Sequence, residues 1–329
     1  MKYVLYPLLL AITIAAALSA YSVYLYGQPG PFDSAQTFQI EKGNGARIIA
    51  SNLKDQKLIS NDLIFLITLK LKGKGATLKA GEYEIQAHAT ISDIQNQLIE
   101  GRVVQRKFTI PEGRTSFEIV EILDATEGLI GEIKDTPAEG TLLPDTYHFT
   151  RDEPRIDKIN QMQQAMASVK ADLWDKRQKD LPFTTWEEAV TLASIVEKET
   201  GVAHERKTIA GVFINRLRQG IPLQSDPTVI YAITKGAHKN EGQGPLGRRL
   251  LLKDLQIESP YNTYRNAGLP PGPIANPGKD AIEAVLNPEK NDFIYFVADG
   301  TGGHVFAKTL VEHNKNVSEW RKLRRSIEK

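Results

Sequence analysis

The N-terminus of this 329-residue chain carries one apolar segment that limits where the rest of the chain can fold. No charged residue occurs between Tyr3 and Phe32, and only Lys2 precedes the segment. A helix that spans a bilayer needs roughly 20 apolar residues, which this segment supplies. Tyrosines, which favour membrane–water interfaces, stand at both ends of it. They are Tyr3, Tyr6, Tyr21, Tyr24 and Tyr26. The segment predicts a transmembrane anchor over residues 1–27.

A cleaved signal peptide is the alternative explanation of this segment. Against it, the apolar run is long and no clean small-x-small cleavage pattern follows. The single positive charge, Lys2, stands on the short side, and positive charge favours the cytoplasmic face. We therefore expect a single-pass protein whose body lies outside the cytoplasm.

Composition excludes several classes of function. The formal net charge is +1, so the electrostatic footprint of a nucleic-acid binder is missing. The chain has no cysteine, which excludes disulfides, thiolate catalysis and cysteine-bound zinc. Its six histidines show no metal-ligand spacing, and no nucleotide fingerprint appears. We expect neither a metal nor a cofactor.

Hydrophobic periodicity predicts short strands that alternate with helices in the first part of the chain after the anchor, and a different, more helical pattern in the C-terminal half, so we expect an α+β fold. Residues 27–31 are typical of a linker. The predicted elements of the first part are a strand at 37–40, helices at 48–58 and 63–71, a strand at 79–85 and a helix from Thr90 or Ser92. The sequence 108–113 repeats the pattern of 38–43, which predicts two small units built alike.

The second part begins with an amphipathic helix at 159–173. The next helix starts at Thr184 or Thr185, with a capping box to Glu187 or Glu188, and is expected to end at Gly201. The remaining predicted elements are a helix at 209–217 ended by Gly220, a hairpin of 293–298 with 304–307 that includes His304, and a closing helix at 318–327.

The segment 193–200 places two acidic groups, Glu197 and Glu199, two positions apart on a predicted helix. That spacing turns them to nearly opposite sides, so they cannot flank one glycosidic bond as a pair. Glu199 shares its side with Leu192 and Ile195, and burial raises the pKa of a carboxyl. A carboxyl that stays protonated near neutral pH can act as a general acid. Glu199 is therefore the candidate, and Glu197 is the fallback.

Pattern alone leaves another interpretation open, in which Glu199 pairs with a buried arginine such as Arg206 or Arg216. Two later segments offer groups that suit sugar hydroxyls. Residues 224–228 are typical of a helix start, with Ser225 or Asp226 as cap, and residues 261–264 combine amide and aromatic groups. The candidate substrate-binding residues are Gln224, Asp226, Tyr261, Asn262 and Tyr264.

Taken together, these segments resemble the YceG-like (MltG) family of endolytic murein transglycosylases. The matching blocks, in order, are 143–147 (LPDTY), 193–200, 212–217 (VFINRL), 223–231 (LQSDPTVIY), 261–264 (YNTY), 268–274 and 295–304. The resemblance covers almost the whole chain. It departs at 141–143 (TLL), where a more aromatic run is expected.

The resemblance implies a LysM-like subdomain over 36–106 and a catalytic domain over 107–329, behind the anchor. It implies cleavage of the MurNAc-β-1,4-GlcNAc bond within nascent glycan strands, giving 1,6-anhydroMurNAc ends and ending strand elongation. The family's catalytic glutamate falls on Glu199, with Thr200 where relatives often carry serine. The implied location is the bacterial cytoplasmic (inner) membrane. The implied partners are glycan strands and cell-wall synthases such as penicillin-binding proteins.

Two further functions stay open from the sequence. One is a non-catalytic glycan-binding scaffold of the cell-wall synthesis machinery. The other is a hydrolysing muramidase, which needs a second carboxylate, for which Asp226 or Glu205 is available.

Overall fold

The computed structural model of the chain describes residues 2–73, 77–237 and 246–327. The chain forms two compact units. The first contains Met1–Arg106 and His148–Asp152, and the second contains Lys107–Tyr147 and Glu153–Lys329. The mixture of helices and short strands confirms the predicted α+β class.

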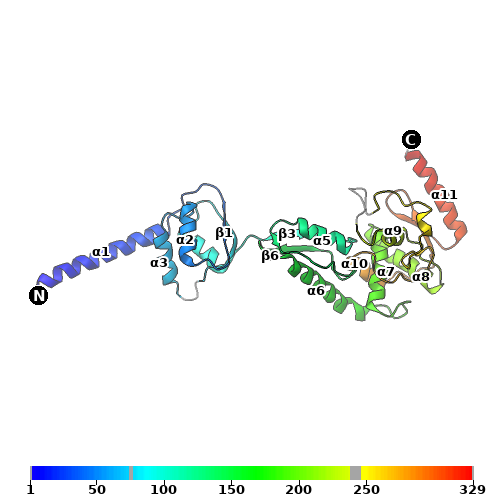
Figure 1. Cartoon of the computed structure of the whole chain (residues 1–329), viewed down its shortest axis with the longest axis horizontal. Coiled ribbons are helices and arrows are strands. Elements are labelled where there is room, and N and C mark those ends of the chain that lie inside the picture. The colour runs from blue at the N-terminus through cyan, green and yellow to red at the C-terminus, as the bar shows by residue number, and fades with distance from the viewer. Residues whose placement is uncertain (1, 74–76, 238–245, 328–329) are drawn as a thin grey trace. The chain divides into compact units, whose positions relative to one another are not determined.

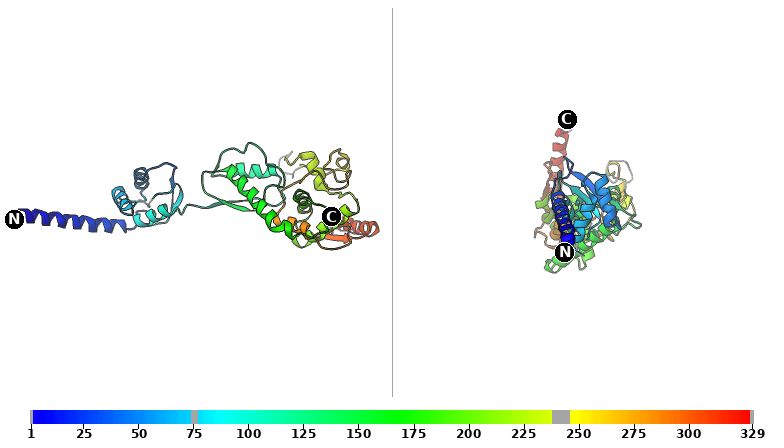
Figure 2. Two further views of the ribbon diagram at one scale, coloured as in Figure 1. Left: turned by 90° about the horizontal axis from the view of Figure 1, so that it is seen from below. Right: turned by 90° about the vertical axis from the view of Figure 1, so that its left-hand side faces the viewer.

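The N-terminal helix α1 (Lys2–Tyr26) is long and apolar enough, over Leu8–Tyr26, to cross a membrane. None of that stretch is buried in the protein, and Figures 1 and 2 show α1 projecting from the helices that follow it. Its last turn differs from the expected interfacial belt. Leu25 and Tyr26 pack on the core of the first unit, and the Tyr26 hydroxyl donates to Gln95 Oε1 at 3.2 Å. The buried Gln95 amide requires such a partner, because an unpaired buried amide is costly.

The first unit is built on one antiparallel strand pair, β1 (Gln36–Ile40) with β2 (Gly81–Ile85). Between the strands in sequence lie α2 (Ala46–Asp55) and α3 (Asp62–Leu71), and α4 (Ile91–Glu100) follows. Thr90 is the cap of α4, since its hydroxyl accepts from the Asp93 backbone N–H at 3.1 Å. The core side chains include Phe38, Ile49, Leu53, Phe65, Tyr83, Ile85, Ile94 and Leu98.

The segment 27–31, predicted as a linker, is held against the first unit. The Gly30 N–H donates to the His88 carbonyl at 3.3 Å. A Cβ on Gly30 would lie 2.4 Å from the Phe32 ring, so only glycine allows this close approach. The composition indicates a turn-rich segment but does not reveal these contacts.

The second unit is larger and mainly helical. The strands β4 (Leu129–Ile130), β6 (Glu153–Pro154), β7 (Tyr295–Ala298) and β8 (His304–Ala307) lie within it, whereas β3 (Arg106–Thr109) and β5 (Thr146–Phe149) contain residues assigned to each of the two units. The strand pairs are β3 with β5, β4 with β6 in parallel, and β7 with β8 antiparallel. The helices of the second unit are α5 (Ser116–Ala125), α6 (Arg155–Leu173), α7 (Trp186–Glu199), α8 (Arg206–Arg218), α9 (Asp226–Thr234), α10 (Lys279–Leu286) and α11 (Leu310–Ile327), with short 3-10 turns at Trp174–Lys176, Ala203–Glu205 and Asp254–Gln256.

The predicted repeat is visible in the backbone of both units. In the first copy β1 leads through Gly43 (φ +92°) into α2, and in the second β3 leads through Gly113 (φ +73°) into α5. Both glycines occupy the left-handed region that favours glycine.

Helix α7 is the centre of the second unit and packs against α8, α9 and α10 (Figure 1). All side chains from Ala189 to Val196 are buried, as expected for a helix that is apolar on every side. Its start confirms the predicted capping box. The Thr185 hydroxyl accepts from the Glu188 N–H at 3.2 Å, and the Glu188 carboxylate accepts from the Thr185 N–H at 2.9 Å.

The predicted end of α7 at Gly201 is wrong. The helix ends at Glu199 because Thr200 turns extended (φ −140°, ψ 132°) and its hydroxyl accepts from the Val202 N–H at 2.9 Å. A β-branched residue favours the extended region, so no left-handed glycine is needed. This ending makes Glu199 the last residue of the helix.

The closing helix α11 starts eight residues earlier than predicted, at Leu310 instead of 318. The cause is a capping box that the sequence analysis missed: the Thr309 hydroxyl accepts from the Glu312 N–H at 3.2 Å, and Glu312 accepts from the Thr309 N–H at 3.1 Å. The added turns bring α11 against β7 and β8, where Figures 1 and 2 both show it.

Candidate active site

Glu199 lines a cavity of about 370 Å³ in the second unit. The cavity lies where the C-terminal end of α7 meets α8, the loop before α9, β7 and α11. Its lining residues are Glu199, Arg216, Leu223, Gln224, Asp226, Tyr264, Phe296 and His313. A pocket of this size with a few convergent polar groups is typical of a ligand site.

The Glu199 carboxyl is held by one short hydrogen bond, in which the Ser225 hydroxyl donates to Oε1 at 2.5 Å. Ser225 is the N-cap residue of α9, one of the two positions predicted for the cap, but its hydroxyl is bound to Glu199 and makes no capping bond. Ser225 is itself fixed from behind. Its N–H donates to Thr263 Oγ1 at 3.0 Å, and Thr263 shares a 2.8 Å hydroxyl contact with Thr228. These three hydroxyl residues are almost fully buried, so the orientation of Glu199 is set by a rigid polar network.

Burial raises the pKa of Glu199 to about 7, because desolvation disfavours the charged carboxylate. The Ser225 hydrogen bond opposes this rise, the Asp226 charge adds to it, and His304 and Arg216 lower the pKa. The position of the carboxyl at the negative end of the α7 dipole acts in the same direction as burial. At neutral pH the group can therefore both give and take a proton.

Glu197, the fallback, points elsewhere and is used in packing. Its Oε2 accepts from the Gly278 N–H at 2.9 Å, at the start of α10, and its Oε1 lies 3.5 Å from the Arg206 guanidinium. The Glu197 side chain is only 5% exposed, and burial raises its pKa as well. Burial alone therefore does not separate the two glutamates. The separation comes from the cavity, which Glu199 lines and Glu197 does not.

The alternative in which an arginine neutralises Glu199 is not seen among the residues that the structure describes. Arg206 pairs with Glu197, with Glu112 at 3.0 Å and with Asp280 at 3.3 Å. Arg216 lines the cavity but lies within 4 Å of no described carboxylate.

The partners of Arg216 are instead backbone carbonyl groups. Its guanidinium donates to the carbonyls of Ile294 at 2.6 Å and Leu223 at 2.8 Å. Burial lowers its pKa, which reflects the desolvation of the guanidinium. The cavity thus keeps a buried positive charge that stabilises a carboxylate when Glu199 loses its proton.

Three of the five candidate substrate-binding residues lie in the cavity with Glu199. They are Gln224, Asp226 and Tyr264. The Tyr264 hydroxyl donates to Asp226 Oδ1 at 2.6 Å, so the two side chains form one polar wall. Gln224 has φ +53°, a left-handed conformation that is strained for a residue other than glycine. Its Oε1 accepts from Arg216 at 3.4 Å.

The other two candidates, Tyr261 and Asn262, lie outside the cavity lining. Asn262 is fully buried, and its side-chain amide donates to the carbonyls of Leu255 and Ile257 at 2.9 Å each, so it shapes the loop from inside. The Tyr261 ring packs against the ring of Tyr231 at 5.0 Å.

Two further residues considered in the sequence analysis, Glu205 and His304, bind each other. Glu205 Oε2 lies 2.7 Å from His304 Nδ1, and Glu205 also accepts from the His304 N–H at 2.8 Å. His304 is the first residue of β8, as the hairpin prediction places it. Glu205 therefore binds His304 and does not line the cavity. Of the two carboxylates considered as a partner for Glu199, Asp226 is the one that shares the cavity with it.

Three features of the site were not predicted from the sequence: Ser225 as the partner of Glu199, and His313 and Phe296 in the cavity lining. Ser225 lies 26 positions from Glu199 and His313 more than a hundred, so no local spacing could reveal them. The available signal for Ser225 is weak: it is a polar residue at a predicted helix start, next to Asp226.

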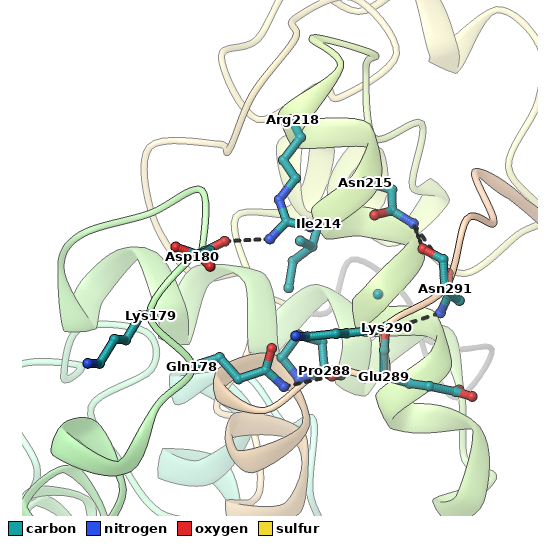
Figure 3. Close-up of a pocket in the computed structure, with 11 residues that line it drawn as sticks. Gln178, Lys179, Asp180, Ile214, Asn215, Arg218, Pro288, Glu289, Lys290 and Asn291 are labelled. Carbon is teal, nitrogen blue, oxygen red and sulfur yellow. Dashed lines mark hydrogen bonds between the residues drawn. The ribbon is translucent and has the colours of Figure 1, made fainter.

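A larger cavity of about 600 Å³ lies beside α8, where Ile214, Asn215 and Arg218 line it (Figure 3). The polar groups that Figure 3 draws mainly bind one another. Gln178 donates to the Pro288 carbonyl at 3.0 Å, and Asn215 donates to the Asn291 carbonyl at 2.8 Å. Its acidic side chains are exposed, so none has the buried setting of Glu199. Within the described part of the chain, no three His, Asp or Glu side chains are grouped so as to hold a metal ion.

Comparison with known proteins matches the model of the YceG-like family to residues 38–319. The chain is 34% identical to an endolytic murein transglycosylase of Bacillus subtilis (strain 168), covering 89% of this chain and 88% of the relative. It is 33% identical to a protein of the same name from Streptococcus pneumoniae serotype 2 (strain D39), covering 86% of this chain and 58% of that longer relative.

A crystal structure of a YceG-like protein from Listeria monocytogenes is also similar. It is 34% identical in sequence, with a TM-score of 0.51, and the match covers 86% of this chain and 99% of that one. The family match covers most of the chain, including the whole site around Glu199. On these findings, the chain belongs to the YceG-like family.

Proposed function

We propose that this protein is a lytic transglycosylase that cuts peptidoglycan glycan strands internally, with Glu199 as its general acid and base. The observation that carries the proposal is the Glu199 carboxyl, which lines the cavity, whose pKa burial raises to about 7, and which has one hydrogen-bond partner among the residues that the structure describes. Both transglycosylase relatives are named endolytic murein transglycosylases, which supports the substrate class.

The chemistry follows from one carboxyl that titrates near neutral pH. Protonated Glu199 donates its proton to the bridging oxygen of a MurNAc-β-1,4-GlcNAc bond while the bond from C1 to that oxygen breaks. The resulting carboxylate then takes the proton of the MurNAc 6-hydroxyl as that oxygen bonds to C1. A 1,6-anhydroMurNAc end forms, no water is consumed, and Glu199 is protonated again. The intramolecular hydroxyl has a high effective concentration, so no second carboxylate is required.

The remaining cavity groups have complementary roles in this proposal. Arg216 stabilises the carboxylate state, since its described hydrogen-bond partners are carbonyl and amide oxygens, which leave its positive charge uncancelled. The walls made by Gln224 and by Tyr264 with Asp226 hold sugar hydroxyls. Ser225 positions Glu199 but makes no contact with the sugar in this scheme.

The N-terminal part supports a proposal about where in the cell the reaction takes place. We propose that α1 anchors the protein in the cytoplasmic membrane, with the body outside the cytoplasm. The order β1, α2, α3, β2 in the first unit is proposed to be a LysM-like glycan-binding module. Cutting strands near the membrane would end their elongation, beside synthases such as penicillin-binding proteins.

Hydrolysis is a second candidate, because Asp226 shares the cavity with Glu199. A carboxylate there could activate a water molecule and give a hydrolysed end. The 2.6 Å hydrogen bond from Tyr264 to Asp226 argues against that role, since it weakens the carboxylate as a base. A non-catalytic scaffold is the third possibility and is tested by the same experiment.

The test is digestion of purified glycan strands by full-length protein, followed by mass analysis of the products. The comparison is wild type against Glu199→Gln, with Glu139→Gln as matched control. Burial also raises the pKa of Glu139 to about 7, but Glu139 does not line the Glu199 cavity. Anhydro ends that are lost only in Glu199→Gln are expected. No products from wild type would favour the scaffold, and products with an added water would favour hydrolysis.

A further inference from the structure

His313 on α11 enters the Glu199 cavity from the far end of the sequence. Its ring stacks on Tyr295 with centroids 5.0 Å apart and an interplanar angle of 21°. The Arg216 guanidinium also lies over the Tyr295 ring, at 5.3 Å. Because an aromatic contact restricts the ring, the imidazole presents a fixed edge to the cavity.

The hydrogen bonding of this imidazole is incomplete. Within the described part of the chain, His313 Nδ1 is buried and has no hydrogen-bond partner. His313 Nε2 is not among the buried unpartnered atoms, and the residue lines the cavity. We infer that Nε2 is the ring nitrogen that a ligand in the cavity can reach. A neutral imidazole has one N–H donor and one acceptor, on different nitrogens.

The environment favours the neutral form with its proton on Nε2. Burial and the charge of Arg216 both lower the pKa of His313. A buried N–H without an acceptor is rarer in proteins than an acceptor without a donor. The proton therefore belongs on Nε2, where it faces the space beside Glu199, and Nδ1 stays an acceptor.

We propose that His313 is a substrate-binding residue whose Nε2–H donates to a neutral oxygen of the bound sugar, a hydroxyl or an acetamido carbonyl. This inference rests on the proposed function for the class of ligand, a saccharide in the Glu199 cavity. It adds a role for α11, so that the last helix of the chain completes one wall of the site.

The chemistry of the cavity supports a neutral oxygen acceptor over an ammonium or a carboxylate. A neutral N–H cannot bind an ammonium group, which is itself only a donor. A carboxylate ligand would lie beside Asp226 in the same cavity, and like charges repel. Sugar hydroxyls and amide carbonyls avoid both problems, and they also satisfy the acceptor side of Asp226 and the donor side of Arg216.

The experiment uses full-length protein in detergent and separates binding from catalysis. Peptide-free GlcNAc–MurNAc glycan strands are titrated into Glu199→Gln and into two double variants, Glu199→Gln with His313→Phe and Glu199→Gln with His313→Gln. Phenylalanine keeps a ring on Tyr295 and removes the N–H, whereas glutamine restores an amide N–H. We expect the Kd to weaken about tenfold with phenylalanine, the effect of one lost hydrogen bond, and to recover in part with glutamine.

A second readout does not depend on any substitution. Nitrogen NMR of the His313 ring should show the Nε2–H tautomer, and the Nε2 signal should shift when the strands are added. In the active protein, His313→Phe should raise KM more than it lowers kcat. This is expected when the lost hydrogen bond is made equally to the bound substrate and to the transition state.

An unchanged Kd in the phenylalanine variant would overturn the proposal. If that variant does not fold, the NMR measurement on the unsubstituted His313 decides, and an Nδ1–H tautomer there would overturn it. These outcomes are distinct from failure of the proposed function. If wild type releases no anhydro ends but the Kd still depends on His313, the transglycosylase proposal fails while the binding role stands.

Discussion

Replacing Glu199 by glutamine should make the second unit more stable than that of wild type at higher pH, and it should also abolish the proposed chemistry. Burial raises the pKa of Glu199 from 4.5 to about 7. Between these values the folded protein holds a proton that the unfolded chain has released. The stabilisation from this group is therefore complete below pH 4.5 and is lost as the pH rises through 7. Glutamine does not titrate, so the variant lacks this loss.

The magnitude follows from the same pKa. At about 1.4 kcal/mol per pH unit, the difference between 4.5 and about 7 amounts to at most about 3 kcal/mol of unfolding free energy. The Glu199 side chain is partly exposed to the cavity, so water screens part of this effect. We expect the variant to gain up to about 3 kcal/mol relative to wild type between pH 5 and 8.

The assay is denaturant unfolding of full-length wild type and Glu199→Gln at several pH values, followed by tryptophan fluorescence. All three tryptophans, Trp174, Trp186 and Trp320, belong to the second unit, so the signal reports on the part that contains the site. Glu139, whose pKa is also raised to about 7, contributes equally to both proteins and cancels in the difference. Parallel stability curves for the two proteins over this range would refute the buried, neutral carboxyl at Glu199.

Three further substitutions test separate parts of the site. Ser225→Ala removes the hydrogen bond that lowers the pKa of Glu199, so the alkaline limb of the kcat/KM profile should move to higher pH; an unmoved limb would contradict that role. Glu197→Ala should lower the unfolding free energy by about 2 kcal/mol, because the Gly278 N–H loses a charged acceptor, while activity per folded molecule is retained. Gln224→Gly should raise the unfolding free energy by about 1 kcal/mol by relieving a left-handed backbone and should weaken glycan binding; a stability loss would show that the side chain outweighs the strain.

Local signals in the sequence predicted most of the helices and strands, because capping and periodicity depend on neighbours in the chain. Thr185 with Glu188 marks the start of α7, and Gly220 (φ +67°) follows the end of α8, as expected. Gly201 does not mark the end of α7, because extended Thr200 ends the helix before the glycine is reached.

The site was predictable only in part, since its partners come from distant segments. Helical spacing turned Glu199 away from Glu197, which the separate partners of the two side chains confirm. The same reasoning placed Ser225 or Asp226 at the cap of α9, and Ser225 does hold that position. That its hydroxyl binds a carboxyl 26 positions away has no signal in the local sequence. His313 carries no local signal at all, and only the packing of α11 brings it into the cavity.

The account depends most on one carboxyl that acts without help from water, and digestion of glycan strands in water labelled with heavy oxygen tests this directly. The masses of the new ends are measured for wild type and for Glu199→Gln. The account predicts anhydro ends without label from wild type and none from the variant. Ends that carry the heavy oxygen would contradict it, because they would show that water attacks the sugar and that Asp226 or another base is needed.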